Sequence, residues 1–301
     1  IEQDKKVAEK TLQVAEANLE ATKLKLDRDK EIAEKTLQVA EANLRAAEAK
    51  QVSEQFIKAT ECVSSKDVLI RVAGVYSLER IGKRSDDDFR LVIEVLTALV
   101  RQSLPSPVDR LSDEKIEEMA KLPYKSLPST TPQDVKAVVD VVGRRGAYQK
   151  TPRNLGWIVL SHTDFSRVSF SGGNNSRKWQ FHWLDFSRAV LIQAYAQEID
   201  FIEGSFWNAD LRLSAFIKCV FTNYGFKKAD LRHARFRDSK FPMSDFDDAR
   251  MEKADFQGAD LSRARGLTQK QVDSAIINSD TKLPPNLVNK YTTGKTLAPP
   301  V

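Results

Sequence analysis

The chain has 301 residues, of which 30% are charged, and its formal net charge is +5. This length accommodates two or more domains, and no apolar run approaches the roughly 18 residues that a membrane-spanning helix needs. Two cysteines, Cys62 and Cys219, lie in segments of different type. They indicate no disulfide framework and fit a reducing cytoplasm, where we expect the protein.

Residues 1–51 are predicted to form one long, charged helix. The segment from Ala8 to Leu19 recurs unchanged from Ala33 to Leu44, at an offset of 25 residues. Seven turns of about 3.6 residues make about 25 residues, so both copies present the same face. That face carries a stripe of leucines, namely Leu12, Leu19, Leu26, Leu37 and Leu44.

A narrow apolar stripe on a long helix is not stable alone in water, so the helix needs a partner. We expect self-association through a coiled coil, which makes the protein a homo-oligomer. The leucines mix spacings of seven and eleven residues, and this mixture predicts a nearly straight or weakly supercoiled bundle. The alternative is a solvated, charged helix that acts as a spacer.

Residues 52–148 are predicted to form a small α-helical domain of the HEAT-like type. We expect a first helix capped by Ser65 and a second capped by Ser85, where three aspartates follow at the positive end of the helix dipole. Pro132 opens a last helix, which we expect to end at Gly143.

A large apolar residue recurs every five positions from Phe181 to Leu261. In most units a small residue stands two positions before it. Five is the period of neither a helix nor a strand, so it indicates a repeat architecture. Every twentieth residue falls in one column, and two columns are nearly all Phe. Four units therefore make one coil of a four-sided β-solenoid, which we expect over residues 149–266. Four residues break the rule of the small position: Trp179, Leu184, Ile199 and Tyr224.

Units such as Ala209-Asp210-Leu211 and Ala259-Asp260-Leu261 make the chain resemble the pentapeptide-repeat family, whose pattern is small-polar-(Leu or Phe)-polar-polar. The resemblance implies a right-handed quadrilateral β-helix whose small and central residues point inwards. It also implies a helical C-terminal cap, which we expect at residues 267–289. The predicted fold class is α+β multidomain, and residues 290–301 are predicted to be a disordered tail.

The segment before the repeats resembles one that bacterial pentapeptide-repeat proteins often carry. It includes Val142-Gly143-Arg144-Arg145. The resemblance implies a bacterial protein. In such proteins membrane helices frequently come first, so an anchor would lie upstream of Ile1 and would hold the protein at the inner face of the membrane.

No pattern in the sequence predicts catalysis, and we expect no enzyme, no cofactor and no metal site. His162, His182 and His233 stand at outward positions on different coils, and no Cys and His spacing fits a metal site. The recurring aspartates precede the central residues, where they are predicted to hydrogen bond to turn backbone.

The family's best known activity is inhibition of a topoisomerase by an acidic solenoid that imitates DNA. Residues 153–265 contain seventeen Lys and Arg against fourteen Asp and Glu, so this solenoid is slightly basic. A DNA mimic needs a dense negative surface, which disfavours that function. The balance is also too even to predict binding of nucleic acid.

Apolar residues stand at outward positions of the first coils, where polar residues are expected. Such a patch is expected to be covered, either by the helical domain folding back on it or by a protein partner. The candidate patch consists of Trp183, Val190, Ile192, Tyr195, Trp207, Leu213 and Ile217.

The preferred function is a non-catalytic protein–protein interaction scaffold or sensor. It would oligomerise through its N-terminal helix and present the solenoid to an unidentified protein partner. The alternatives are a topoisomerase-directed inhibitor and an effector or immunity component that acts by assembling on a target.

Overall fold

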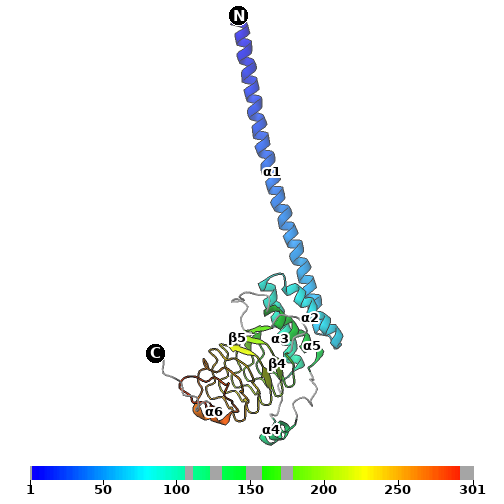
Figure 1. The fold of residues 1–301 in the computed structure, drawn as a ribbon. Coiled ribbons are helices and arrows are strands. Elements are labelled where there is room, and N and C mark those ends of the chain that lie inside the picture. The colour runs from blue at the N-terminus through cyan, green and yellow to red at the C-terminus, as the bar shows by residue number, and fades with distance from the viewer. Residues whose placement is uncertain (1, 106–110, 123–130, 147–157, 171–178, 292–301) are drawn as a thin grey trace, which may run out of the picture. The chain divides into compact units, whose positions relative to one another are not determined.

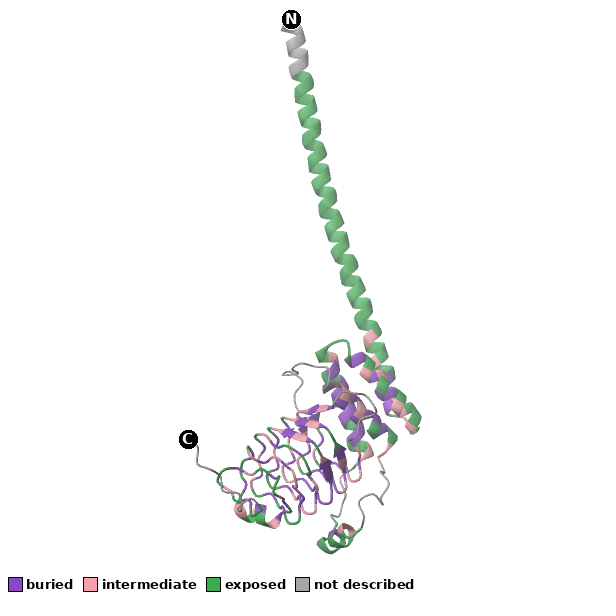
Figure 2. Cartoon of the chain, viewed as in Figure 1, coloured by how far each residue is buried: buried purple, intermediate pink, exposed green. Residues whose placement is uncertain are grey.

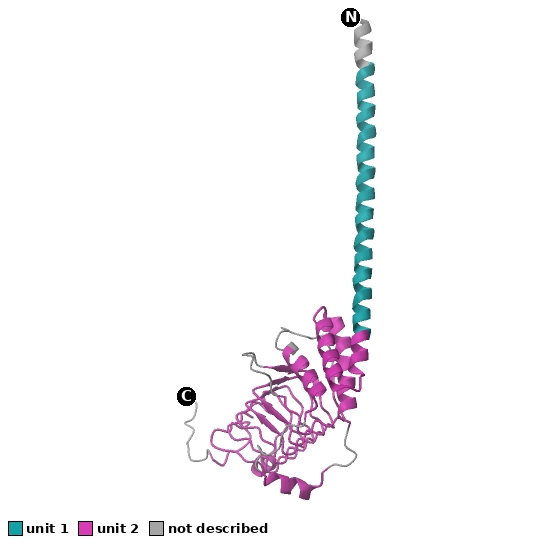
Figure 3. Cartoon of the chain, turned by 90° about the vertical axis from the view of Figure 1, so that its right-hand side faces the viewer, with its two compact units in different colours: residues 1–57 teal, residues 58–301 magenta. Residues whose placement is uncertain are grey.

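The computed structural model describes residues 2–105, 111–122, 131–146, 158–170 and 179–291 (Figure 1). The chain divides into two compact units, residues 1–57 and residues 58–301 (Figure 3). The first boundary was expected between residues 51 and 52. The expected loop at 171–178 and all but two residues of the expected tail at 290–301 lie outside the described residues.

The first unit is a single helix. The helix α1 (Glu2–Val63) runs for 62 residues, and residues 1–50 contain neither Gly nor Pro to interrupt it. All five leucines of the stripe are exposed, by between 56% and 61%. Figure 2 shows this long helix as exposed along most of its length. The coiled coil itself stays a prediction.

The second unit begins with the end of α1 and three helices that pack on one another: α2 (Val68–Gly82), α3 (Asp86–Ser103) and α5 (Gln133–Gly146). A buried polar network joins them. Asp134 on α5 accepts hydrogen bonds from Arg71 Nε on α2 at 2.7 Å and from Ser103 Oγ on α3 at 3.1 Å. Because Asp134 is fully buried, these partners are needed to offset its lost hydration. The HEAT-like interpretation stays a prediction.

Two helix ends differ from the prediction. The N-cap of α2 is Asp67, whose side chain accepts from Leu69 N, and Ser65 instead accepts from Asp67 N. Asp67 directly precedes the first helical residue, which is where a cap must stand. The helix α5 runs three residues past Gly143, because that glycine fits against Trp179: an added Cβ would lie 2.5 Å from the indole. The predicted cap of α3 by Ser85 is confirmed.

Short parallel strands form the start of the solenoid: β1 (Ile158–Val159), β2 (Gln180–His182), β3 (Leu184–Asp185), β4 (Tyr195–Gln197), β5 (Asp200–Ile202), β6 (Ala215–Ile217) and β7 (Val220–Thr222). Phe181 pairs with Phe201 and Phe201 with Phe221, which confirms the predicted period of twenty. The first coil departs from it, because Ile158 pairs with Leu184, 26 residues on.

Later coils continue the same register through single bridges, such as Asp230 with Arg250 and Asp245 with Arg265. The phenylalanine columns stack inside them. The rings of Phe201 and Phe221 lie 4.9 Å apart and 7° from parallel, and neither residue is exposed. The core is therefore formed by stacking of coil on coil.

From residue 179 to the corner at Gly258, a left-handed residue stands two positions after each central residue, as at Leu213 (φ 63°) and Lys253 (φ 58°). Aspartates support the turns as predicted. The side chain of Asp245, for example, accepts from Asp247 N at 3.0 Å, and that of Asp185 accepts from Ser187 N at 2.9 Å. These hydrogen bonds help offset the cost of left-handed backbone at residues other than glycine.

The helix α6 (Gln269–Ser274) follows the last coil. Gln271 Nε2 donates to the carbonyl oxygens of Phe246 and Ala249, at 2.9 Å each. The chain after α6 returns to the solenoid, where Ile276 pairs with Asp255 and Lys282 with Asp260. That α6 stabilises the solenoid as a cap stays a prediction.

Candidate interaction surface

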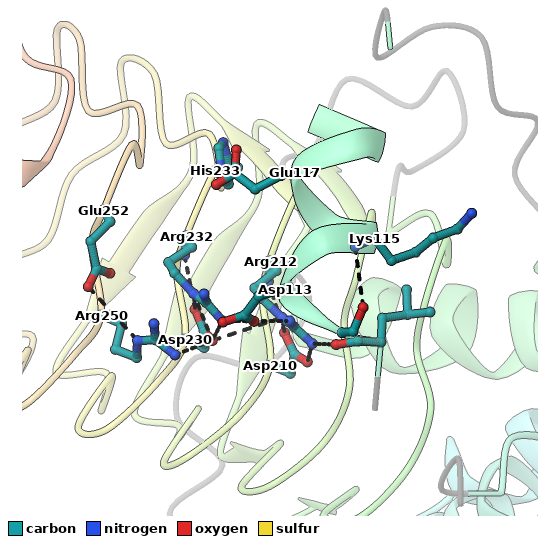
Figure 4. Close-up of polar contacts among 12 residues, drawn as sticks. Asp113, Lys115, Glu117, Asp210, Arg212, Asp230, Arg232, His233, Arg250 and Glu252 are labelled. Atoms are coloured by element: carbon teal, nitrogen blue, oxygen red, sulfur yellow. Dashed lines mark hydrogen bonds and ion pairs between the residues drawn. The ribbon is translucent and has the colours of Figure 1, made fainter. Parts of the chain in front are cut away.

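The helix α4 (Asp113–Ala120) lies against the outside of the solenoid (Figure 4). Its Ile116 is only 1% exposed and packs in one cluster with Val190, Ile192 and Leu213 of the coils. Met119 and Ala120 on α4 pack against the same cluster. Three residues of the predicted patch are thus covered by the chain itself.

The sequence explains why this short segment is helical. Ser112 caps it by accepting from Lys115 N, and Asp113 and Glu114 stand in the first turn. The apolar side chains recur at spacings of three and one, so they share one face. Eight residues are too few for a stable helix in water, so docking on the solenoid is what holds α4 in this conformation.

Acidic residues of α4 bind basic residues of three coils. Asp113 Oδ1 accepts from Arg232 Nη2 at 2.8 Å and from Arg212 Nη1 at 3.3 Å. One turn later, Glu117 contacts His233 Nε2 at 2.9 Å and accepts from Lys253 Nζ at 3.0 Å. We call the solenoid side of this contact the α4 face, made of Val190, Ile192, Arg212, Leu213, Arg232, His233 and Lys253.

The two arginines are held in place by the solenoid itself. Arg212 donates to Asp210 from Nε at 2.8 Å and from Nη2 at 2.6 Å, and Arg232 binds Asp230 in the same way, twenty residues on. The Arg212 side chain is only 4% exposed. Both guanidinium groups are therefore oriented by bidentate pairs, and α4 binds to donors that remain after these pairs are made.

The same contacts keep the carboxyl groups of Asp113 and Glu117 charged. A hydrogen bond from Arg232 holds the pKa of Asp113 below its ordinary value, and one from His233, with a second from Lys253, does so for Glu117. Burial lowers the pKa of the Arg212 guanidinium, but the hydrogen bonds with Asp210 outweigh it and the pKa is raised. At neutral pH α4 is thus an anionic helix on a cationic face.

The energetics indicate that α4 is held less firmly than the core. Full burial of one isoleucine stabilises by about 1.5–3 kcal/mol, and Ile116 is the one buried residue of α4. The side chains of Asp113 and Glu117 remain 59% and 50% exposed, so their ion pairs are screened by solvent and add little. Arg212 Nη2 also donates to the carbonyl oxygen of Leu111 at 3.0 Å. These few contacts attach α4 less extensively than the stacked coils hold one another.

The other four residues of the predicted patch are half-buried and lie outside the Ile116 cluster. Trp183 Nε1 donates to Glu203 at 2.6 Å, and the guanidinium of Arg188 lies 4.7 Å from the ring centre of Trp207. Tyr195 donates its hydroxyl proton to Gln197, and Ile217 belongs to β6. The structure therefore assembles only part of the predicted patch into one surface.

Neither α4 nor its acidic residues were predicted from the sequence. Ser112 followed by Asp113 and Glu114 is the signal that could have found it, with Ile116, Met119 and Ala120 on one face. Of the three histidines, His233 belongs to the α4 face. Among the described residues, no three His, Cys, Asp or Glu side chains are placed to hold a metal ion. Nor does any helix in the described ranges have the length and apolarity to span a membrane.

Comparisons with known proteins concern the repeats of the solenoid. The family described as Pentapeptide repeats matches residues 229–265, in eight copies. A search of curated proteins found no match. Three solved structures are similar in part. A pentapeptide repeat protein from the thylakoid lumen of Arabidopsis thaliana is 19% identical, with a TM-score of 0.32 over 36% of this chain and 70% of that chain.

The pentapeptide repeat protein Rfr23 from the cyanobacterium Cyanothece 51142 is 12% identical, with a TM-score of 0.28 over 43% of this chain and 86% of its own. QnrB1, a plasmid-mediated fluoroquinolone resistance protein, is 17% identical, with a TM-score of 0.28 over 42% of this chain and 77% of its own. The repeat match and the strand register of twenty residues together show that the C-terminal part of this chain is a β-solenoid of pentapeptide repeats.

Proposed function

We propose that the protein is a non-catalytic scaffold that oligomerises through α1 and presents its solenoid to protein partners. The observation that carries the proposal is the exposed leucine stripe of α1. The unit that contains the stripe is a single helix, so no other element of that unit covers it. Five leucines exposed by more than half would be buried if stripes of several copies packed together.

The second half of the proposal rests on the solenoid. Its phenylalanine columns are buried by the coils themselves, as Phe206, Phe226 and Phe246 illustrate. Its outer positions are therefore free of a structural role in that core and are available for recognition. Repeat folds commonly use such extended outer surfaces to bind other proteins.

The alternative for α1 is a monomeric spacer. Two ion pairs within the helix favour it locally, Glu31 with Lys35 and Glu41 with Arg45. Pairs of this kind add only about 0.2–0.5 kcal/mol each. This stabilisation is small beside that gained by burying a leucine stripe that runs along both halves of the internal duplication. We therefore favour assembly of several chains.

The experiment measures mass in solution by light scattering. Wild type is expected at a multiple of 33.9 kDa. Replacing Leu12, Leu19, Leu37 and Leu44 together by Ala should leave a monomer and should lower the helix signal in circular dichroism.

The matched control replaces Val14 and Val39, which are equivalent positions of the two copies. Both valines are exposed, by 61% and 60%, but they lie two residues from the stripe leucines and so point away from it. Their change to Ala should leave the oligomer intact. A monomeric wild type, or an oligomer that survives the leucine substitutions, would remove the proposal.

A further inference from the structure

The α4 face has the properties of a binding site that exists before a helix docks. Val190, Ile192 and Leu213 give it an apolar floor, and Arg212 and Arg232 give it a basic rim. Each arginine is already oriented by an aspartate of its own coil. Apolar side chains at outward corners are not needed for the core, because the central Leu211 beneath them is fully buried by the coils.

The helix α4, which occupies this face, makes few buried contacts with it. Only Ile116 of α4 is buried, and both acidic contacts stay open to solvent. A surface that is preformed, and whose occupant is lightly held, is suited to exchange one helix for another.

We propose that the α4 face binds an acidic amphipathic helix of a partner protein, and that α4 is the resident helix which the partner displaces. The inference rests on the proposed scaffold function and names the partner class for one face of the solenoid. Charge complementarity carries it. The face presents Arg212, Arg232, His233 and Lys253 around its apolar floor. This arrangement favours a helix on which carboxylates flank an apolar side chain.

The contacts of α4 define the pattern that the partner must reproduce. Asp113 and Glu117 stand four residues apart on one side of the helix, and Ile116 lies between them on the buried side. A second apolar residue three positions on, as at Met119, packs on the edge of the floor. A basic helix would leave the arginines without carboxylate partners. An entirely polar helix would leave the apolar floor without an apolar side chain to pack on it.

The test uses a fluorescent peptide with the sequence of residues 111–122 and the full-length protein. Wild type should bind the peptide weakly, because its face is occupied for most of the time. The Ile116→Asp variant cannot bury its own α4 and should bind the peptide on the order of ten-fold or more tightly than wild type does, since apparent affinity scales with the fraction of open faces. Raising the salt concentration should weaken this binding.

Three controls make the result specific to the face. Glu118→Ala changes an exposed residue of α4 that contacts no coil residue in the α4 face, and it should keep the wild-type affinity. Adding Arg232→Glu to the Ile116→Asp variant should abolish binding. A peptide with Asp113→Lys should then recover it, which a misfolded face could not do. Equal affinity of wild type and Ile116→Asp for the peptide, or no binding to either, would overturn the proposal.

A second copy of this chain is the competing source of the helix. An Ile116→Asp protein, which keeps the face, is mixed with an Arg232→Glu protein, which keeps the helix. Both carry the leucine substitutions in α1, so that assembly through α1 does not contribute. A complex between them would overturn the partner assignment, and its absence alongside peptide binding supports it. If the leucine substitutions fail to give monomers, the scaffold proposal fails while the peptide result still decides this inference.

Discussion

Replacing Gly204 by Ala tests whether the buried Tyr224 leaves room only for a glycine at residue 204. Tyr224 stands at a position that most units give to a small residue, and it is fully buried. Its hydroxyl donates to the carbonyl oxygen of Leu184 at 3.0 Å, two coils away. The ring passes Gly204 on the coil between them, and an added Cβ there would lie 2.1 Å from the ring carbon Cε2.

The tyrosine has no room to move aside. Its ring centre lies 5.0 Å from that of Phe206 and 5.8 Å from that of Phe221. Overpacking of a filled core costs typically about 1–3 kcal/mol, and a contact this short places Gly204→Ala near the upper end. The backbone of Gly204 has no left-handed φ, so the whole cost is steric.

A double-mutant cycle isolates this contact. Tyr224→Ala alone should cost about 3–5 kcal/mol, as large core truncations do. In that background Gly204→Ala should cost almost nothing, which gives a coupling of about 3 kcal/mol between the two positions. The free energies come from urea unfolding of the full-length protein, followed by tryptophan fluorescence.

Gly225→Ala is the matched control, because its added Cβ would find its nearest neighbour at 3.7 Å. This variant should be neutral or slightly stabilised. The steric reasoning is wrong if Gly204→Ala costs no more than Gly225→Ala, or if its cost persists in the Tyr224→Ala background.

Two further predictions concern the contacts of the solenoid with the helices. The carboxyl groups of Asp113 and Glu117 have pKa values held below 3.8 and 4.5 by their basic partners. Their contribution to docking of α4 is therefore complete above those ordinary values and is lost as the pH falls through the lowered ones. The NMR signal of the Ile116 methyl groups should report this loss, and a signal that stays unchanged until the solenoid itself unfolds in acid would contradict the prediction. Gly143→Ala should lower the melting temperature in calorimetry, because the added methyl meets Trp179 at 2.5 Å, and an unchanged melting temperature would show that the helix shifts without cost.

The repeat could be predicted from the sequence because it depends on local rules that recur. The period of twenty gave the strand register directly, as the pairing of Phe201 with Phe221 confirms. Even the exception at Tyr224 follows the columns, since Gly204 precedes it by one coil and supplies the space. The pairing of Ile158 with Leu184 departs from the period because the first coil contains six more residues.

The helical part was predicted less well because its boundaries depend on contacts that a single sequence does not display. Ser65 and Asp67 are both good capping residues. Only the end of α1 at Val63 shows that Ser65 belongs to the turn between two helices. In the same way, Gly143 is expected from the sequence to end a helix. In the structure it lies inside α5, where it makes room for Trp179.

The α4 face depends on a pattern that the sequence does contain, in its outer columns. Leu213, His233 and Lys253 occupy the same corner of successive coils, each with left-handed backbone. Leu213 packs in the cluster with Ile116, and the other two contact Glu117. The corner column thus changes from apolar to basic along the solenoid, and its apolar corner packs near Ile116 whereas its basic corners contact Glu117. The inner columns of a solenoid repeat because each coil must pack on the next. The outer columns are not constrained in this way, so a change from apolar to basic residues along one of them indicates the chemistry of what it contacts. For this chain, the outer columns predict recognition of an acidic amphipathic helix, whereas the inner columns explain only why the solenoid is stable.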